Sequence, residues 1–246
     1  MSRLAIIGGT GLLSLNNLVV SRIENVTTPF GQPSAAVVVG ELGDREVFFL
    51  ARHGEKHTIP PHKINYRANI WALKSLGVEQ VIAVAAVGGI TPEMEPARVV
   101  VPDQVIDYTH SRCGTYFDDN LEEVIHVDFT YPYNKALRER IIAASLDLDL
   151  NAFEGGVYGA TQGPRLESIA EINRMERDGC DIVGMTGMPE AALARELELG
   201  YACCAVVANW AAGRGGDEII TMDEIRKNLE IGMARIHAIL ERVLSR

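Results

Sequence analysis

Glycines, hydroxyls and basic side chains stand directly after several short apolar runs in this 246-residue sequence. Such runs are typical of buried strands, and ligands of open α/β sheets bind beyond the carboxyl ends of strands. At these ends Thr10 and Thr186 offer hydroxyls, Arg52 a charged fork and His53 a further donor. Together with the glycine-rich turns beside them, these groups predict a site for a phosphate-like anion.

Two alternatives to this interpretation stay open at the level of the residues alone. GGTG at 8–11 is also a weak signal for a NAD-binding oxidoreductase, although its spacing is not GxGxxG and no acidic residue ends a second strand. Arg52 and His53, taken by themselves, are equally typical of a surface ion pair. The joint occurrence of four such strand ends favours the anion site.

Hydrophobic periodicity predicts the elements that must hold these ends in place. Strands are expected at 4–7, 35–39, 47–51, 80–87, 99–107, 155–161, 181–185 and 201–208. Helices are expected at 64–76, 134–147, 168–178, 189–199 and 223–244. Residues 108–131 show no periodicity, and a loop of this length is usually functional or reaches a partner. The alternation predicts one α/β domain over residues 1–246, with a mostly parallel or mixed sheet covered on both faces.

Composition limits the partners of the chain. The net charge of −10 argues against nucleic acid, because phosphate backbones need a concentrated basic patch, but one or two local cations suffice for a small anion. No apolar run is long enough to cross a bilayer, and no charged leader precedes the first strand, so no membrane partner is expected. The four cysteines contain no CxxC pair, which favours buried thiols in a reducing, cytoplasmic compartment.

Longer segments carry a resemblance to a known family. They are IIGGTG at 6–11, TPFGQPS at 28–34, the block at 50–77, TQGPRLES at 161–168 and the block at 185–203. In these segments the chain resembles the trimeric purine nucleoside phosphorylase superfamily, and most closely its 5′-methylthioadenosine phosphorylase branch. The resemblance implies a twisted mixed β-sheet surrounded by helices. It also implies cleavage of the bond between a purine and ribose by inorganic phosphate, a co-substrate, with no metal and no organic cofactor.

The resemblance also assigns roles to individual positions. Phosphate is expected on Thr10, Arg52, His53, Thr186 and backbone groups of Ala85 and Ala86, with Met185 beneath the ribose. The threonine hydroxyl that the family usually has at position 85 is missing here. A homotrimer is implied, which leaves open a dimer of trimers, and His126 with its loop would reach the neighbour's site.

The base-binding positions depart from the methylthioadenosine branch. That branch has two aspartates where this chain has Asn209 and Ala211, and serine where it has Glu167. Glutamate and asparagine are what the inosine- and guanosine-cleaving branch uses, because a carboxylate accepts from N1–H of a 6-oxopurine and an amide donates to N7 or O6. The expected base pocket is Glu167, Asn209 and their neighbours Leu166, Trp210 and Ala211. An ordinary helix cap is the alternative for Glu167.

The other end of the expected pocket is apolar. Met222 falls where the inosine-cleaving branch has a histidine for the 5′-hydroxyl, and Ile225 follows one helical turn later. Both side chains are apolar, which favours a methylthio group. Ordinary core contacts of the last helix are the alternative. Both ends together predict phosphorolysis of S-methyl-5′-thioinosine to hypoxanthine and 5-methylthioribose 1-phosphate. The rival substrates are 5′-methylthioadenosine, and inosine or guanosine.

Overall fold

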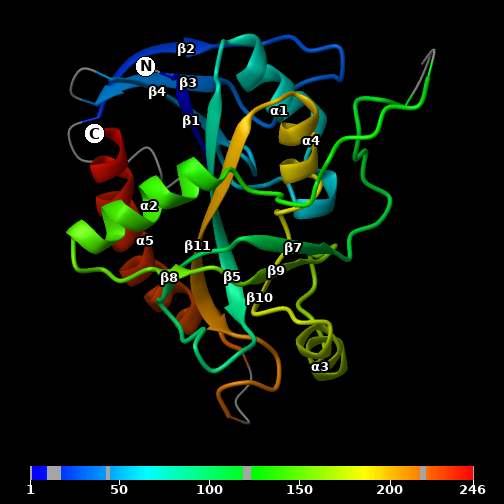
Figure 1. Cartoon of the computed structure of the whole chain (residues 1–246), viewed down its shortest axis with the longest axis vertical. Coiled ribbons are helices and arrows are strands. Elements are labelled where there is room, and N and C mark those ends of the chain that lie inside the picture. Colours follow the sequence, from blue (N-terminus) through cyan, green and yellow to red (C-terminus); the bar gives the residue numbers. More distant parts are fainter. Residues whose placement is uncertain (1, 10–17, 43–44, 119–122, 217–219, 246) are drawn as a thin grey trace.

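A branched mixed β-sheet forms the centre of the molecule (Figure 1), which is a computed structural model describing residues 2–9, 18–42, 45–118, 123–216 and 220–245. Its strands are β1 (Leu4–Gly8), β2 (Val19–Glu24), β3 (Val37–Leu42), β4 (Arg45–Ala51), β5 (Gln80–Gly89), β6 (Val99–Val101), β7 (Gln104–Asp107), β8 (Phe153–Glu154), β9 (Val157–Ala160), β10 (Ile182–Gly184) and β11 (Gly200–Trp210). The helices are α1 (Tyr66–Ser75), α2 (Lys135–Asp147), α3 (Ile169–Arg177), α4 (Glu190–Glu196) and α5 (Met222–Leu244), with a short 3₁₀ turn, η2 (Pro61–Lys63).

The long strand β5 is the branch point of the sheet. Its first half pairs in parallel with β1, its end pairs antiparallel with β10, and its other edge pairs in parallel with β11 along its length. The order from one edge is β2-β3-β4-β1-β5-β10-β9-β7, while β11 leads to β6 and β8. The parallel pairing brings the carboxyl ends of β1, β4, β5 and β11 to the same region of the molecule.

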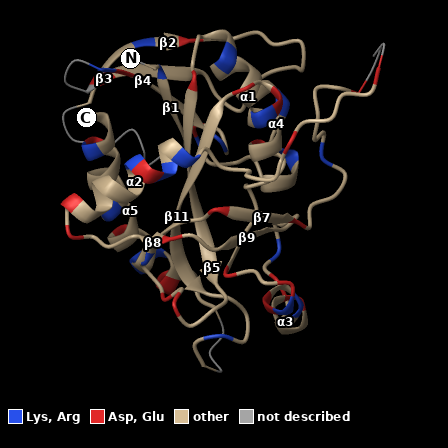
Figure 2. Ribbon diagram, in the orientation of Figure 1, with Lys and Arg blue, Asp and Glu red and all other residues tan. Residues whose placement is uncertain are grey.

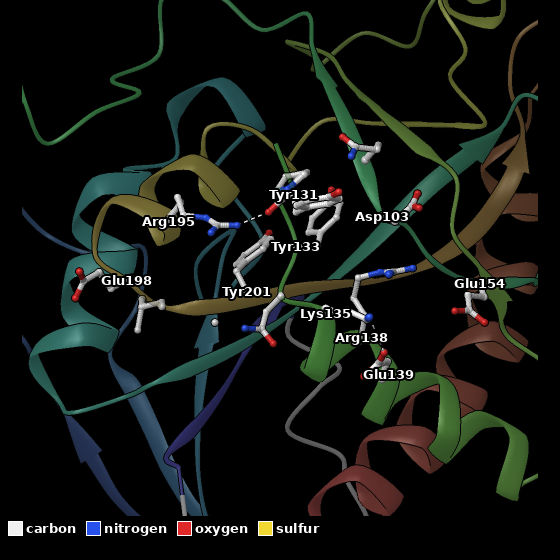
Figure 3. A pocket seen from close by; sticks show the side chains of 15 residues that line it. Asp103, Tyr131, Tyr133, Lys135, Arg138, Glu139, Glu154, Arg195, Glu198 and Tyr201 are labelled. Carbon is white, nitrogen blue, oxygen red and sulfur yellow. Dashed lines mark hydrogen bonds and ion pairs between the residues drawn. The ribbon is translucent and has the colours of Figure 1, made fainter. Parts of the chain in front are cut away.

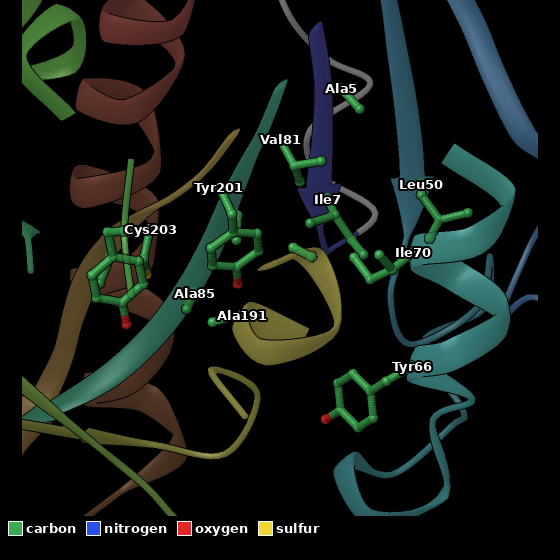
Figure 4. Packing of buried hydrophobic residues seen from close by; sticks show 14 of the residues in the cluster. Ala5, Ile7, Leu50, Tyr66, Ile70, Val81, Ala85, Ala191, Tyr201 and Cys203 are labelled. Carbon is green, nitrogen blue, oxygen red and sulfur yellow. The ribbon is translucent and has the colours of Figure 1, made fainter. Parts of the chain in front are cut away.

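Both faces of the sheet are covered, as the apolar strands require. Alternate residues of β1 point to opposite faces: Ala5 and Ile7 contact the cluster that includes α1 and α4, whereas Leu4 and Ile6 contact the cluster with α2 and α5. Figure 4 shows the first cluster, with Ile7 and Val81 of the sheet close to Ile70 of α1. This two-sided packing fixes the strand ends.

Local signals set where helices begin. The side chain of Asn65 accepts from the N–H of Ala68 and starts α1, two residues later than the predicted helix. Ser168 and Glu171 form a capping box at the start of α3. Thr221 caps α5 in the same way as Asn65, through its hydroxyl and the N–H of Glu224. These caps direct the loops that precede the helices.

Most predicted elements are confirmed, with three differences. The expected strand at 99–107 is interrupted at Pro102 and Asp103, so β6 pairs with β11 while β7 pairs with β9. β2 was missed, because this edge strand is held by backbone pairing to β3 and its side chains are largely exposed. The short β8 was missed as well. The described parts of 108–131 form no helix or strand, and the stretches next to residues 119–122 project from the rest of the molecule (Figure 1).

Basic and acidic residues are interspersed along the outer helices and loops (Figure 2). No helix among the described residues has the length and apolar character needed to cross a membrane. The same residues contain no group of three or more His, Cys, Asp or Glu side chains arranged to hold a metal ion. All four cysteines are free thiols; Cys180, Cys203 and Cys204 are buried as expected, whereas Cys113 is exposed in the irregular segment.

Candidate active site

A cavity of about 470 Å³ lies where the carboxyl ends of β1, β4, β5, β10 and β11 meet. Its volume is within the range of small-molecule sites. The residues around it are Gly9, Arg52, His53, His57, Pro61, Val84 to Gly88, Leu166, Glu167, Val183 to Thr186, Ala208, Asn209, Ala211, Ala212, Ile220, Ile225, Leu229 and Met233. Most of the predicted site residues are therefore brought together. Thr10 lies outside the described residues.

Arg52 is held by a buried ion pair at one end of the cavity. Its Nε and Nη2 donate to the two carboxylate oxygens of Glu190 at 2.7 and 2.8 Å, and the two side chains are 2% and 0% exposed. Nη1 donates to the carbonyl of Val84 at 2.9 Å, and Nη2 also to that of Ile7 at 3.2 Å. Burial lowers the pKa of Arg52, but the charge and hydrogen bonds of Glu190 raise it by more. The net shift of the pKa is upward, so the guanidinium stays charged.

This pairing changes the role expected of Arg52. A guanidinium has five N–H donors, and the four bonds above leave one donor, on Nη1. The fork predicted for phosphate is directed to Glu190 instead. Arg52 can therefore give an anion in the cavity a single hydrogen bond, and its formal charge is already balanced.

His53 presents an acceptor to the cavity when it is neutral. Its Nδ1 lies 2.8 Å from the carbonyl oxygen of Ile59, which can only accept, so Nδ1 carries the proton and Nε2 has a lone pair. Burial lowers the pKa of His53, and the nearby charge of Arg52 lowers it further. The ring of His57 stacks on it at 4.5 Å between centroids.

The remaining groups at this end are small. Thr186 is 8% exposed and follows β10, where its N–H lies 3.4 Å from the hydroxyl of Tyr158. Ala85 is buried, while Ala86 is exposed to the cavity, so the chain offers backbone but no hydroxyl at these two positions. Gly9 adds its backbone after β1. This end of the cavity therefore supplies directed hydrogen bonds with little net charge.

A bulge in β11 directs Asn209 into the cavity. Val207 pairs with Val87 and Asn209 with Gly88, so Ala208 is an extra residue in the ladder. The Asn209 amide nitrogen donates to the carbonyl of Trp210 at 2.6 Å, which leaves its second N–H and its oxygen for a ligand. The side chain of Trp210 is not among those around the cavity. Its ring instead lies so close to Gly215, which has a φ of 70°, that a Cβ there would be 2.1 Å from it.

Glu167 lines the same cavity as Asn209 but comes from a different segment, the loop that follows β9. Its Oε1 accepts a hydrogen bond of 2.7 Å from the hydroxyl of Thr161, which is 7% exposed. Ser168 and Glu171 form the helix cap, so Glu167 is not the capping residue. The carboxylate is therefore held at the cavity by a neighbour in its own loop.

An apolar wall closes the other end of the cavity. It consists of Ile220 and, at successive turns of one face of α5, Ile225, Leu229 and Met233. Met222 is the first residue of α5, is 60% exposed and does not contribute to this wall. Of the two residues expected at the methylthio end, the structure thus places Ile225 at the cavity of the single chain and Met222 outside it.

A larger cavity, of about 950 Å³, lies elsewhere in the molecule (Figure 3). Arg138, Glu139, Arg195 and Glu198 lie around it, so its wall mixes both charges. Tyr201 in its wall donates its hydroxyl to Glu190 at 2.9 Å. This cavity contains none of the predicted site residues.

Comparison with known proteins agrees with this geometry. The model of the family described as "Phosphorylase superfamily" matches residues 3–245. The chain belongs to the phosphorylase superfamily. The match confirms the resemblance seen in the sequence, and it removes the basis for a dinucleotide-binding alternative at GGTG.

Individual members of the superfamily are similar over nearly the whole chain. A probable S-methyl-5′-thioinosine phosphorylase of Pseudomonas syringae pv. tomato is 56% identical over 245 residues, 100% of this chain and 99% of the relative. A 6-oxopurine nucleoside phosphorylase of Pyrococcus furiosus is 50% identical over 226 residues, 89% of this chain and 83% of the relative.

Solved structures of superfamily members confirm the predicted α/β fold. A methylthioadenosine phosphorylase from an antarctic soil metagenomic library has a TM-score of 0.93 and 34% identity, covering 99% of this chain and 85% of that one. Methylthioadenosine phosphorylase from Schistosoma mansoni in complex with adenine has a TM-score of 0.93 and 31% identity, covering 100% and 91%.

Several residues of the site in this superfamily member were not predicted from the sequence. Glu190 was missed because an acidic residue in the first turn of a helix is ordinary. Leu229 and Met233 were missed although their spacing of four residues from Ile225 is a usable signal. Thr161 carried no local signal for its bond to Glu167.

Proposed function

We propose that the chain catalyses the phosphate-dependent cleavage of S-methyl-5′-thioinosine to hypoxanthine and 5-methylthioribose 1-phosphate, a purine salvage reaction. The observation that carries the proposal is one cavity with Glu167 and Asn209 beside an apolar wall of α5. The name of the Pseudomonas syringae relative supports the same substrate. A polar site that pairs one base edge can reject another base by roughly 10⁴-fold.

The base end suits a 6-oxopurine. An ionised Glu167 accepts from N1–H of hypoxanthine, whereas N1 of adenine is itself an acceptor and would be repelled. The free N–H of Asn209 donates to N7 or O6, where negative charge grows as the purine leaves. The methylthio end suits Ile225, Leu229 and Met233, which offer no partner to a hydroxyl.

In the proposed mechanism, phosphate waits on one face of C1′ and the purine leaves from the other. The C1′–N9 bond breaks with its electron pair going to the base, and a phosphate oxygen bonds to C1′. Thr10, Arg52, His53, Thr186 and the backbone at Ala85 and Ala86 hold the phosphate, while Met185 contacts the ribose. Nε2 of neutral His53 accepts a hydrogen bond from the P–O–H group of hydrogen phosphate. Overall, one proton passes from phosphate to the purine, so the sugar phosphate leaves as a dianion.

Base release from three nucleosides tests the proposal directly. S-methyl-5′-thioinosine, 5′-methylthioadenosine and inosine are compared at equal concentration, with and without phosphate. Preference for methylthioinosine supports both ends of the pocket. Preference for methylthioadenosine overturns the argument for Glu167 and Asn209, and preference for inosine overturns the argument for the apolar wall.

We further propose that the enzyme works in the cytoplasm as a homotrimer, in which His126 reaches a neighbour's site. The exposed apolar side chains of Val124 (75%) and Tyr131 (73%) in the irregular segment support this assembly, as does exposed Leu166 at the cavity. Light scattering coupled to size exclusion distinguishes a trimer from a dimer of trimers, and a monomer would contradict the proposal.

A further inference from the structure

Arg112 connects the segments that carry the two ends of the candidate site. Its guanidinium donates to carbonyls of Thr161 and Gln162 at 3.1 and 2.8 Å, directly before the loop with Glu167. It also donates to carbonyls of Met185 and Met188 at 2.9 and 2.6 Å, on either side of Thr186. One rigid fork therefore spans the base-binding loop and the phosphate-binding turn.

Further contacts restrict the guanidinium itself. Nε donates to the side-chain oxygen of Gln162 at 3.1 Å, and Nη1 to the hydroxyl of Tyr66 at 3.2 Å. The guanidinium carbon also lies over the ring of Tyr66, 5.3 Å from its centroid. Within the described ranges, Arg112 forms no ion pair with a carboxylate. The five N–H groups are shared among six neutral acceptor atoms, whereas Arg52 donates to a carboxylate as well as to carbonyls.

The backbone around Arg112 is anchored on both sides. The N–H of Tyr108 donates to the carbonyl of Ala160 at 2.8 Å. On the other side, the hydroxyl of Thr115 and the N–H of Tyr116 each donate to Glu196 of α4 at 2.7 Å. The fork thus starts from a fixed point in an irregular segment.

The two segments that Arg112 joins also touch each other directly. Gly163 has a φ of 59°, and a Cβ at this position would lie 2.4 Å from the sulfur of Met185. The positive φ favours glycine at this position, and any side chain here would displace that of Met185. β9 pairs with β10, and Thr161 donates to the carbonyl of Gly184 at the start of this approach. Beyond that pairing, the bonds from Arg112 tie the loop to the turn.

We propose that Arg112 is a positioning residue that sets the distance between the base-selecting carboxylate of Glu167 and the phosphate-binding hydroxyl of Thr186. It touches neither substrate. It acts by holding the carbonyls of 161–162 and 185–188 on one guanidinium, so that base and phosphate are presented to C1′ at the separation the reaction needs. The proposal rests on the proposed phosphorolysis.

The test compares Arg112→Ala and Arg112→Lys with the wild-type enzyme, using the nucleoside that the wild type prefers. Loss of alignment by about an ångström costs on the order of 10²-fold in rate, so kcat of Arg112→Ala is expected to fall by about that factor. Lysine keeps the positive charge but lacks the planar guanidinium. The kcat of Arg112→Lys should therefore lie between those of the wild type and Arg112→Ala. The ratio of methylthioinosine to methylthioadenosine turnover should fall as well.

Arg138→Ala is the matched control. Arg138 likewise donates to two backbone carbonyls, those of Pro102 and Val101 at 2.9 and 3.2 Å, but it lies at the larger cavity. Its kcat should stay within about twofold of the wild type, since additive effects are expected for distant sites. All rates are measured well below the melting temperature of each variant.

Chemical rescue separates a positioning role from a purely structural one, because added guanidinium ion can restore kcat only where the missing guanidinium acts directly. Guanidinium ion at low millimolar concentration should restore part of the kcat of Arg112→Ala, with sodium chloride at the same ionic strength as the control. An unchanged kcat in folded Arg112→Ala, or a loss equal to that of Arg138→Ala, overturns the proposal. If Arg112→Ala does not fold, Arg112→Lys with wild-type kcat overturns it. A wild type that cleaves no nucleoside contradicts the proposed function instead.

Discussion

Arg52 and Glu190 form a bidentate ion pair inside the core, 138 residues apart in the chain, with bonds of 2.7 and 2.8 Å. The pair fixes the guanidinium against the phosphate end of the cavity and cancels its charge. Under the proposed function, Arg52 would therefore contribute to phosphate binding through the direction of a hydrogen bond rather than through net positive charge.

Removing the carboxylate should be costly. Glu190→Ala leaves a buried guanidinium without its partner, so the free energy of unfolding is expected to fall by about 3–5 kcal/mol. Tyr201→Phe removes only the hydroxyl that donates to Glu190 and should cost roughly 1–3 kcal/mol. Urea denaturation of both variants measures this. A Glu190→Ala protein as stable as Tyr201→Phe would contradict the account of the pair.

Asn209→Asp tests the amide at the bulge. Replacing its free N–H by a carboxylate oxygen removes a donor to the leaving purine, which is worth about 10²-fold in kcat. Methylthioinosine turnover should fall by that factor, and methylthioadenosine turnover should rise relative to it. Trp210→Phe is the control, because the Trp210 side chain lies outside the cavity wall and only its carbonyl holds Asn209. Full methylthioinosine activity in Asn209→Asp would contradict the role of the Asn209 amide as a donor to the purine.

Glu167→Gln tests the other half of base recognition. Glutamine has one oxygen in place of two, and when that oxygen accepts from Thr161 its NH₂ group is opposed to N1–H, so kcat/KM for methylthioinosine should fall by about 10²-fold. Thr161→Val, which removes the 2.7 Å hydrogen bond to the carboxylate, should have a smaller effect that Thr161→Ser reverses. Equal kcat/KM in wild type and Glu167→Gln would show that the carboxylate does not contact the base.

His53 gives a pH dependence with a defined sign. Its pKa is lowered in the folded protein, so the unfolded chain binds the proton first as the pH falls. The contribution of His53 to stability is complete above its ordinary pKa of 6.5 and is lost as the pH falls through the lower folded value. In thermal melts across this pH range, the melting temperature should fall less steeply with falling pH for His53→Gln than for the wild type. Identical slopes would mean that His53 titrates normally.

The apolar wall predicts discrimination at the 5′ end. Leu229→Asn should lower the ratio of methylthioinosine to inosine turnover by about 10–200-fold, the range for apolar pockets. Met222→Ala should leave the ratio unchanged, since Met222 is exposed and outside the wall. A large effect at Met222 with none at Leu229 would instead support the register expected from the sequence.

The sequence predicted the strand ends but not the contacts that join them. Apolar runs followed by glycine marked β1 and β5, and an apolar run ending at Asn209 marked β11, because burial on both faces leaves a local pattern. The pairs Arg52–Glu190 and Arg112–Met185 leave none, since their members are 138 and 73 residues apart and each side chain has an ordinary local explanation. Met222 was misplaced because the turn at which α5 reaches the cavity depends on its docking, not on its own residues.

The cavity joins the first and last elements of the described chain. Gly9 follows β1, and Met233 lies in α5, so its walls come from both ends of the polypeptide. During synthesis on the ribosome, the wall for the methylthio group is therefore absent until α5 has emerged and docked on β11. A nascent chain cannot form the complete binding site earlier, and nucleoside can stabilise only the finished fold.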